Sequence, residues 1–238
     1  MLANLSTSTQ SGRLDGDVHR PNAFRHELLD FITEELPKWR DDPDRPVSTS
    51  ETQITEHLAD YLSSASRKSP GWDILQFRTE AADEEMKVRK IDLAPKACGV
   101  IIWIEGRRYT QYEPLLPIEC KRLPTPKQMK RDEREYVFSK YASTGGIQRF
   151  KAGHHGAKHS LGGMIAYIEN ETATVWDERI AGWIKELVAA NENGWTLKDL
   201  IELTKELKPE RLTVLRSSHT RQKGLPDIEL RHMWVEMN

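Results

Sequence analysis

The sequence has little cysteine and no long apolar run. Cys98 and Cys120 are its two cysteines in 238 residues, too few for a disulfide framework. No apolar segment approaches the roughly 18 residues that a membrane-spanning helix requires. Residues 1–17 lack the basic stretch followed by an apolar one that marks a secretory signal. These absences argue against a disulfide-rich secreted scaffold and against a membrane partner, so we expect a protein of the reducing cytoplasm.

Motifs of several large enzyme classes are also missing. There is no P-loop, no glycine-rich dinucleotide motif, no Gly-x-Ser-x-Gly and no internal repeat. What remains is the composition of a globular protein, with 37% hydrophobic and 30% charged residues. At this length we expect one domain over residues 21–238. We expect it to follow a mobile tail, rich in Ser, Thr and Gly, over residues 1–20.

The N-terminal half predicts two helices followed by strands. Apolar residues at helical spacing predict a helix that begins near Phe24 and ends at Pro37. Ser48 followed by Glu51 resembles the capping box of a second helix, whose apolar stripe places Glu51 on the buried side. Four strand-like segments follow, over about 72–79, 86–93, 100–105 and 109–123.

The C-terminal half predicts further helices around a sheet. A polar helix is expected over residues 127–142, ended by Gly145 and Gly146, and a buried strand is expected over 163–169. The remaining expected elements are helices over 176–188 and 196–207 and strands over 211–221 and 227–237. This order predicts an α/β fold in which helices cover the faces of a mixed sheet.

The strongest chemical signal lies in residues 115–123, where an apolar run enters Glu119-x-Lys121. Alternation along a strand puts Glu119 and Lys121 on one face and Cys120 on the other. A carboxylate and an ammonium at the end of a buried strand are costly without partners, which a divalent metal and a phosphate would supply. Asp92, on an earlier strand-like segment, would complete the metal site. The pattern predicts metal-dependent phosphodiester cleavage, and its alternative is a surface ion pair between Glu119 and Lys121.

The candidate metal ligands are oxygen donors. Mg²⁺, for which Mn²⁺ could substitute, prefers octahedral oxygen coordination with few protein carboxylates and several waters. Asp92 and Glu119 would supply the carboxylates, and the backbone carbonyl of Cys120 would supply a third ligand. The alternative for Asp92 is a turn acid before Pro95.

Two further residues have expected catalytic roles. Lys121 would orient the attacking water and stabilise the charge of the transition state. Glu51, on the buried side of its helix, could hold a metal-bound water or a second metal. The alternative for Glu51 is electrostatic capping of its helix.

Glu51, Ile91-Asp92 and residues 118–122 together resemble the motif of the PD-(D/E)XK nucleases, of the restriction-endonuclease-like superfamily. The resemblance implies a restriction-endonuclease-like core, in which a mixed four-stranded sheet is flanked by two helices. That core would span about residues 49–170, with an elaboration of helices and strands over 171–238. The resemblance also implies an Mg²⁺-dependent endonuclease that acts on DNA.

The chain departs from the family pattern in two places. Ile91 stands where the family usually has Pro, and the gap from Asp92 to Glu119 is long. The long gap leaves Glu105 and Glu113 as alternative upstream acids.

Residues 145–150, GGIQRF, and 162–169, GGMIAYIE, resemble the region after the motif in small bacterial nucleases, which are often associated with defence against foreign DNA. Gln148 and Arg149 are therefore expected on the substrate side, with Arg149 contacting a phosphate. The alternative for Arg149 is a structural pair with a core carboxylate such as Glu169.

The charge distribution suggests where DNA would bind. The formal net charge of -2 does not by itself indicate a nucleic-acid partner, but basic residues far outnumber acidic ones between 121 and 159. The expected backbone contacts in this segment are Arg122, Lys127, Lys130 and Arg131. The alternative interpretation of this basic segment is a solvated helix face.

A different function is also possible from the sequence: a non-catalytic nucleic-acid-binding or assembly subunit that kept the fold. Association as a homodimer, or with a partner subunit of a defence system, is a further expectation.

The stretch HHGAKH contains His154, His155 and His159, and the spacing of four residues between His155 and His159 could bind Zn²⁺ on a helix. Gly153 and Gly156 argue against a helix there, and no Cys is nearby. We therefore expect solvated histidines in a loop.

Overall fold

The protein is described here by a computed structural model that covers residues 22–48, 50–85, 87–127, 131–141, 145–192, 194–222 and 224–238. The tail expected over residues 1–20 and the candidate contact Lys130 lie outside the described residues.

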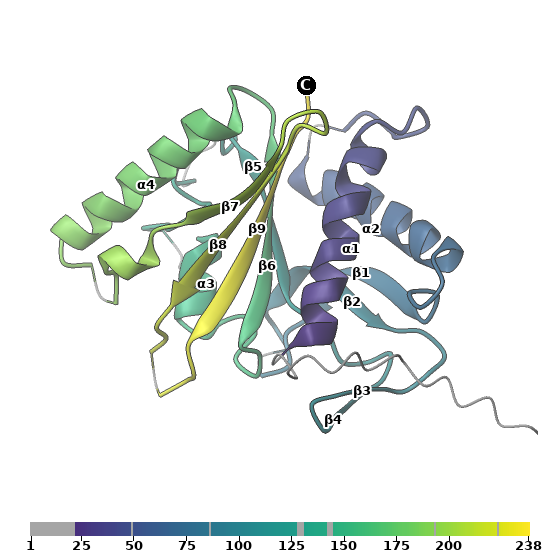
Figure 1. Ribbon diagram of the computed structural model, residues 1–238. Helices are drawn as coiled ribbons and strands as arrows, with labels where there is room; N and C mark the ends of the chain where they lie inside the picture. The colour runs from purple at the N-terminus through teal and green to yellow at the C-terminus, as the bar shows by residue number, and fades with distance from the viewer. Residues whose placement is uncertain are drawn as a thin grey trace, which may run out of the picture.

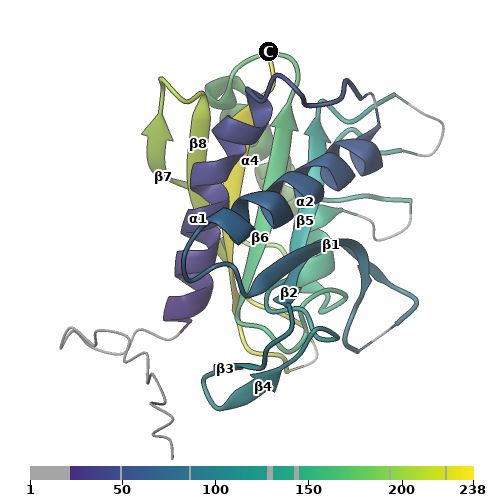
Figure 2. The same cartoon turned by 90° about the vertical axis from the view of Figure 1, so that its right-hand side faces the viewer.

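The described chain forms a three-layer α/β/α structure around one mixed sheet (Figure 1). Helices α1 and α2 cover one face of the sheet, while α3 and α4 lie on the other (Figures 1 and 2). The helices are α1 (Ala23–Arg40), α2 (Glu51–Lys68), α3 (Gly146–Lys151) and α4 (Ala173–Ala189). The α/β class predicted from the sequence is confirmed.

Seven strands build the sheet, in the order β1-β2-β5-β6-β9-β8-β7. They are β1 (Leu75–Ala82), β2 (Lys90–Ala97), β5 (Ile118–Leu123), β6 (Leu161–Ile168), β7 (Glu202–Leu207), β8 (Leu212–His219) and β9 (Ile228–Glu236). A separate hairpin of β3 (Ile102–Ile104) and β4 (Arg107–Tyr109) lies beyond one end of the sheet, at the bottom of Figure 2.

The strand directions divide the sheet into two parts. β1 pairs antiparallel with β2, and β2 pairs antiparallel with β5. β6 then runs parallel to β5 on one side and to β9 on the other. β6 is central, and every one of its residues is buried, as expected for a strand covered on both faces. The remaining strands, β8 and β7, extend the sheet beyond β9 by antiparallel pairing.

Two apolar clusters lie on opposite faces of this sheet. The first joins Leu28, Ile32 and Leu58 of α1 and α2 to alternate side chains of the strands, including Cys120. The second packs α4, through Trp176 and other residues, against the other face. The predicted alternation along 118–123 is thereby confirmed, because Cys120 lies in the first cluster and Glu119 contacts the Lys121 ammonium.

The end of α1 and the start of α2 both differ from the sequence prediction. α1 continues through Pro37 to Arg40, because Trp39 is buried in the core and Arg40 donates to the carbonyl of Glu210 at 2.6 Å. Those contacts offset the hydrogen bond that proline cannot donate. The N-cap of α2 is Ser50 rather than Ser48, and its Oγ accepts from the backbone N–H of Gln53 at 3.1 Å.

Two predicted helices are wrong. Residues 131–141, the described part of the helix expected over 127–142, form turns in which Asp132 Oδ1 accepts from the backbone N–H of Arg134. Such side-chain bonds compete with helical hydrogen bonding.

Residues 202–207 form β7 instead of a helix, since pairing with β8 supplies backbone hydrogen bonds that local propensity does not reveal. The two C-terminal strands and the helix expected over 176–188 are confirmed. No helix of the described residues has the length and apolar character needed to cross a membrane.

Candidate functional site

The candidate site lies where β2 separates from β5. The two strands share a single bridge, between Leu93 and Ile118. Past that bridge, backbone N–H groups of β5 are bound by side chains instead of by β2. Cys120 N–H donates to Asp92 Oδ2 at 3.0 Å, and Arg122 N–H donates to Glu51 Oε2 at 3.0 Å. Two acids from different elements are thus fixed beside the strand that carries Glu119.

The Lys121 side chain lies among three carboxylates. Its Nζ is 3.2 Å from Asp92 Oδ2, 3.4 Å from Glu51 Oε1 and 3.4 Å from Glu119 Oε2. These acids come from β2, α2 and β5, so the fold unites residues that are far apart in sequence. Glu51, Asp92, Glu119 and Lys121, which the sequence nominated as one site, therefore form one cluster, which we call the Lys121 cluster.

Glu119 is the most deeply placed acid of the Lys121 cluster, with no exposed side-chain surface. Its Oε2 accepts from Arg149 Nη1 at 2.9 Å, and its Oε1 contacts His155 Nδ1. Burial alone would raise the pKa of Glu119, but His155, Lys121 and Arg149 more than offset it, so its pKa lies well below the ordinary value. Glu119 is therefore an ionised carboxylate.

Asp92 behaves in the opposite way. Burial and the neighbouring charge of Glu119 raise its pKa to about 6, even though Lys121 and the Cys120 N–H act to lower it. The strand-like segment expected over 86–93 would place Asp92 near its end, but Asp92 is the third residue of β2, which continues to Ala97. For the same reason it is not a turn acid before Pro95, which itself lies within β2.

Lys121 stays protonated in this setting. Burial by itself would lower its pKa, but Asp92, Glu51 and Glu119 raise it above the ordinary value. The buried Cys120 thiol has its pKa raised by burial and then by Asp92, so it is a neutral core group rather than a thiolate.

The donor set suits Mg²⁺. No three His, Cys, Asp or Glu side chains are arranged as a metal-binding group within the described ranges. Mg²⁺ does not require such a cage, because it binds through one or two carboxylates and keeps several waters. Asp92 and Glu119 supply hard oxygens beside Lys121. The Cys120 carbonyl faces the same side as its N–H, toward Asp92, since both groups of one residue project to one edge of a strand.

A small cavity of about 40 Å³ adjoins this arrangement. Glu51 and Asp92 line it, together with Thr55 and residues of β1. Its volume is enough for a water molecule. The acids of α2 and β2 thus have solvent-accessible space next to them, while Glu119 lies deeper.

Several other nominated residues are paired within the protein. Arg122 donates to both oxygens of Glu169, at 2.8 and 2.5 Å, so Glu169 pairs with Arg122 and Arg149 pairs with Glu119. The side-chain oxygen Oε1 of Gln148 accepts from the backbone N–H groups of Ser139 and Gly145, at 3.1 and 3.3 Å, and so caps α3. These contacts give Arg122 and Gln148 structural partners, whereas Arg149 reaches the Lys121 cluster.

The basic segment is less exposed than its sequence suggests. Lys127 is exposed, but Arg131 binds Glu135 at 2.5 Å and approaches Glu51 at 3.9 Å. Lys151, inside the same segment, is buried against Asp199. Much of the counted positive charge is therefore neutralised by internal pairs.

The two alternative upstream acids lie outside the Lys121 cluster. Glu105 accepts from the backbone N–H of Asn22 and pairs with Arg25. Glu113 accepts from the N–H and hydroxyl of Thr110, at 2.9 and 2.6 Å. The geometry therefore favours Asp92 as the acid that accompanies Glu119.

Sequence reasoning missed one member of the site. His155 was expected in a solvated loop, yet it is 2% exposed and contacts Glu119 Oε1. His159 is likewise buried and contacts Glu84 at 3.2 Å. Gly153 and Gly156, both at positive φ, correctly excluded a helix, but they also turn the loop inward. That paired use of glycine was the available signal.

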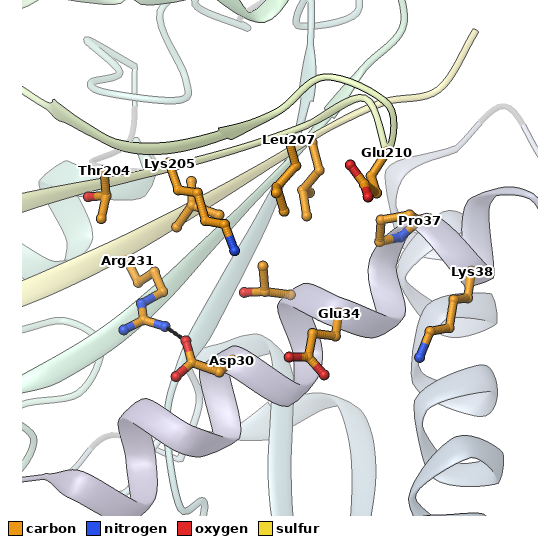
Figure 3. A pocket seen from close by; sticks show the side chains of 12 residues that line it. Asp30, Glu34, Pro37, Lys38, Thr204, Lys205, Leu207, Glu210 and Arg231 are labelled. Atoms are coloured by element: carbon orange, nitrogen blue, oxygen red, sulfur yellow. Dashed lines mark hydrogen bonds and ion pairs between the residues drawn. The ribbon is translucent and has the colours of Figure 1, made fainter.

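A separate groove of about 700 Å³ lies between α1 and the β7–β9 part of the sheet (Figure 3). Its lining mixes acids and bases, and Arg231 of β9 pairs with Asp30 of α1 across it (Figure 3). No residue of the Lys121 cluster lines it. The groove is therefore separate from the Lys121 cluster.

Comparison of the chain with models of protein families, with curated proteins and with solved structures found no match.

The raised pKa of Asp92 predicts a pH-dependent effect of Asp92→Asn. Unfolded Asp92 titrates near 3.8, while folded Asp92 titrates near 6, so the folded state takes up a proton first as the pH falls. This group therefore costs stability above pH 6, and the cost disappears toward pH 3. In EDTA, Asp92→Asn should melt at a higher temperature than wild type at pH 7.5, and the difference should shrink to about a third by pH 4.5 and vanish toward pH 3. A difference that stays constant across this range contradicts the raised pKa.

Proposed function

We propose that this chain is a divalent-metal-dependent nuclease with a restriction-endonuclease-like core, which cleaves phosphodiester bonds of DNA. The observation that carries the proposal is the Lys121 cluster, in which an ammonium lies 3.2–3.4 Å from three carboxylates of α2, β2 and β5. Charge of both signs, largely removed from water, is expensive to maintain for stability alone. Its concentration beside a small cavity fits a site for a cation and an anionic substrate.

The order of elements around the Lys121 cluster supports the same proposal. α2 precedes the mixed strands β1, β2 and β5, α3 follows them, and β6 then pairs parallel to β5. This matches the helix, mixed four-stranded sheet and second helix that the PD-(D/E)XK resemblance implies. The matching elements run from Glu51 to Ile168, within the predicted core of 49–170. The strands β7–β9 and α4 are the C-terminal elaboration.

Each residue then has a defined task. Asp92, Glu119 and the Cys120 carbonyl would hold the metal, which when bound lowers the pKa of a water and offsets charge on the phosphate. With those acids engaged, Lys121 would be released from part of its pairing and could donate to the attacking water or to a phosphate oxygen. Glu51 would keep hold of the Arg122 N–H and orient Lys121 through its other oxygen. Arg149 would steady Glu119 and face the substrate with its remaining donors.

The direct test is a substrate panel. Purified protein is incubated with supercoiled plasmid, linear duplex, single-stranded DNA and RNA, each in Mg²⁺, Mn²⁺ or EDTA. We expect cleavage of DNA in either metal and none in EDTA. Bacterial defence against foreign DNA is the setting that the family resemblance implies, and a preference for unmodified over methylated plasmid would support it.

The panel also separates the alternative function. Binding of DNA without cleavage in either metal would contradict the nuclease and favour a non-catalytic nucleic-acid-binding subunit. Cleavage of RNA alone would keep the chemistry and overturn the choice of substrate. Cleavage that persists in EDTA would contradict the metal dependence.

A further inference from the structure

The loop after α3 is built to place His155 beneath the Lys121 cluster. Gly153 and Gly156 adopt positive φ of 65° and 63° on either side of it. A Cβ on Gly156 would lie 2.8 Å from Pro117 Cγ, so this turn packs closely against the segment that leads into β5. Arg221 secures the loop by donating to the carbonyls of Gly156 and His159, at 2.9 and 3.0 Å.

The His155 ring is held from two sides. Its edge meets the Phe150 ring, with centroids 6.3 Å apart and planes at 89°. Its Nδ1 lies within ion-pair distance of Glu119 Oε1, and neither of these two buried atoms makes a hydrogen bond of good geometry among the described residues. An N–H on Nδ1 is the donor that a carboxylate oxygen in this position would accept. The other oxygen, Oε2, faces Arg149 and Lys121.

We propose that His155 is a positioning residue for Glu119: it holds Oε1 so that Oε2 stays directed at Lys121 and at the metal. This inference rests on the proposed function, because it gives the role of His155 in that same site. The two oxygens of a carboxylate are chemically equivalent, and only their partners decide which one faces the reaction. A buried Oε1 without a donor would turn toward Lys121 or Arg149 and take the carboxylate out of its metal-binding orientation. Partners of metal ligands typically contribute about 10–100-fold to metal affinity.

The test measures metal binding without substrate. Mn²⁺ is titrated calorimetrically into the full chain at pH 7.5, for wild type, His155→Leu, His155→Asn and His155→Gln. Asn carries an N–H near the place of Nδ1, whereas Gln carries it near the place of Nε2. We expect Mn²⁺ affinity to fall about 10–100-fold in the Leu and Gln variants and to stay within about threefold of wild type in the Asn variant.

His159 provides the matched control. It lies in the same loop, is equally buried and contacts Glu84 instead of Glu119. His159→Leu should lower the melting temperature but leave Mn²⁺ affinity unchanged. If His155→Leu fails to fold, the comparison of His155→Asn with His155→Gln decides the question, because both are polar and only Asn restores the Nδ1 donor.

The outcomes separate the two claims. If wild type binds Mn²⁺ and His155→Leu binds it with the same affinity, the role of His155 is overturned. Equal Mn²⁺ affinities of the Asn and Gln variants overturn it as well. Both results leave the proposed nuclease intact. An equal loss in His159→Leu also overturns it, because the effect would then be general to the loop. Wild-type protein that binds no Mn²⁺ overturns the metal site and the positioning role together.

Discussion

Lys121→Met is expected to remove cleavage and to destabilise the protein at the same time. Methionine keeps the length of the side chain but removes the ammonium that lies between the carboxylates of Glu51, Asp92 and Glu119. Breaking a buried ion pair by removing one partner costs about 3–5 kcal/mol. We expect a loss near the lower limit, because the side chains of Glu51 and Asp92 are 22% and 27% exposed. Turnover should fall by about 10²–10³-fold, the usual cost of losing one preorganised donor at a transition state.

Divalent metal should separate the two effects of Lys121→Met. Mg²⁺ can replace the missing positive charge, so it should raise the melting temperature of the variant more than that of wild type. It should not restore cleavage. Lys185→Met is the control, because Lys185 is exposed on α4 and lies outside the Lys121 cluster. A wild-type melting temperature for Lys121→Met in EDTA would contradict the described cluster, and wild-type turnover would contradict the role of Lys121.

Gly145→Ala should have the second largest effect, although Gly145 is not a member of the Lys121 cluster. A Cβ at this position would lie 2.4 Å from Phe138 Cα, a backbone atom that cannot swing aside. The start of α3 would have to move away from the 135–138 segment, whose carbonyls accept from Gly146, Ile147 and Gln148. We expect a destabilisation of about 3 kcal/mol from overpacking. Cleavage should also fall, because α3 carries Arg149 to Glu119.

Gly182→Ala is the matched control for this substitution. Gly182 lies inside α4, and a Cβ there would meet nothing within 4 Å. The same chemical change should therefore stabilise the protein, by up to about 1 kcal/mol, through helix propensity. Thermal unfolding of both variants measures the contrast. A neutral Gly145→Ala would contradict the close approach of α3 to Phe138.

Short-range patterns predicted the parts of the fold that depend on local periodicity. The stripe from Trp176 to Val188 predicted α4, and the continuous apolar run of β6 predicted a buried strand. Alternation in 118–123 predicted which side of β5 carries Glu119 and Lys121. Local sequence patterns gave wrong predictions where contacts with residues distant in sequence determine the secondary structure. Trp39 and Arg40 extend α1 past Pro37 through contacts with the core and with Glu210, and β8 turns residues 202–207 into a strand.

The same distinction holds for the site. Glu51, Asp92, Glu119 and Lys121 could be nominated, because each stood out against an apolar element. Their convergence on one ammonium depends on the separation of β2 from β5, which the sequence does not encode locally. His155 was missed because Gly153 and Gly156 predicted only the absence of a helix, although the turns that they allow also direct the loop inward. Pairing of Arg122 with Glu169 and of Arg131 with Glu135 could not be read from the excess of basic residues.

Plasmid nicking by wild type and Glu119→Gln, purified in parallel, tests the central claim most directly. Glutamine keeps the shape of Glu119 but removes the charge that binds Arg149, Lys121 and the proposed metal. Glu169→Gln serves as the control, since Glu169 is a partly buried acid that pairs with Arg122 and lies outside the Lys121 cluster. We predict Mg²⁺-dependent nicking by wild type and Glu169→Gln, and none by Glu119→Gln or in EDTA. Equal nicking by wild type and Glu119→Gln would contradict the assignment of cleavage to this cluster.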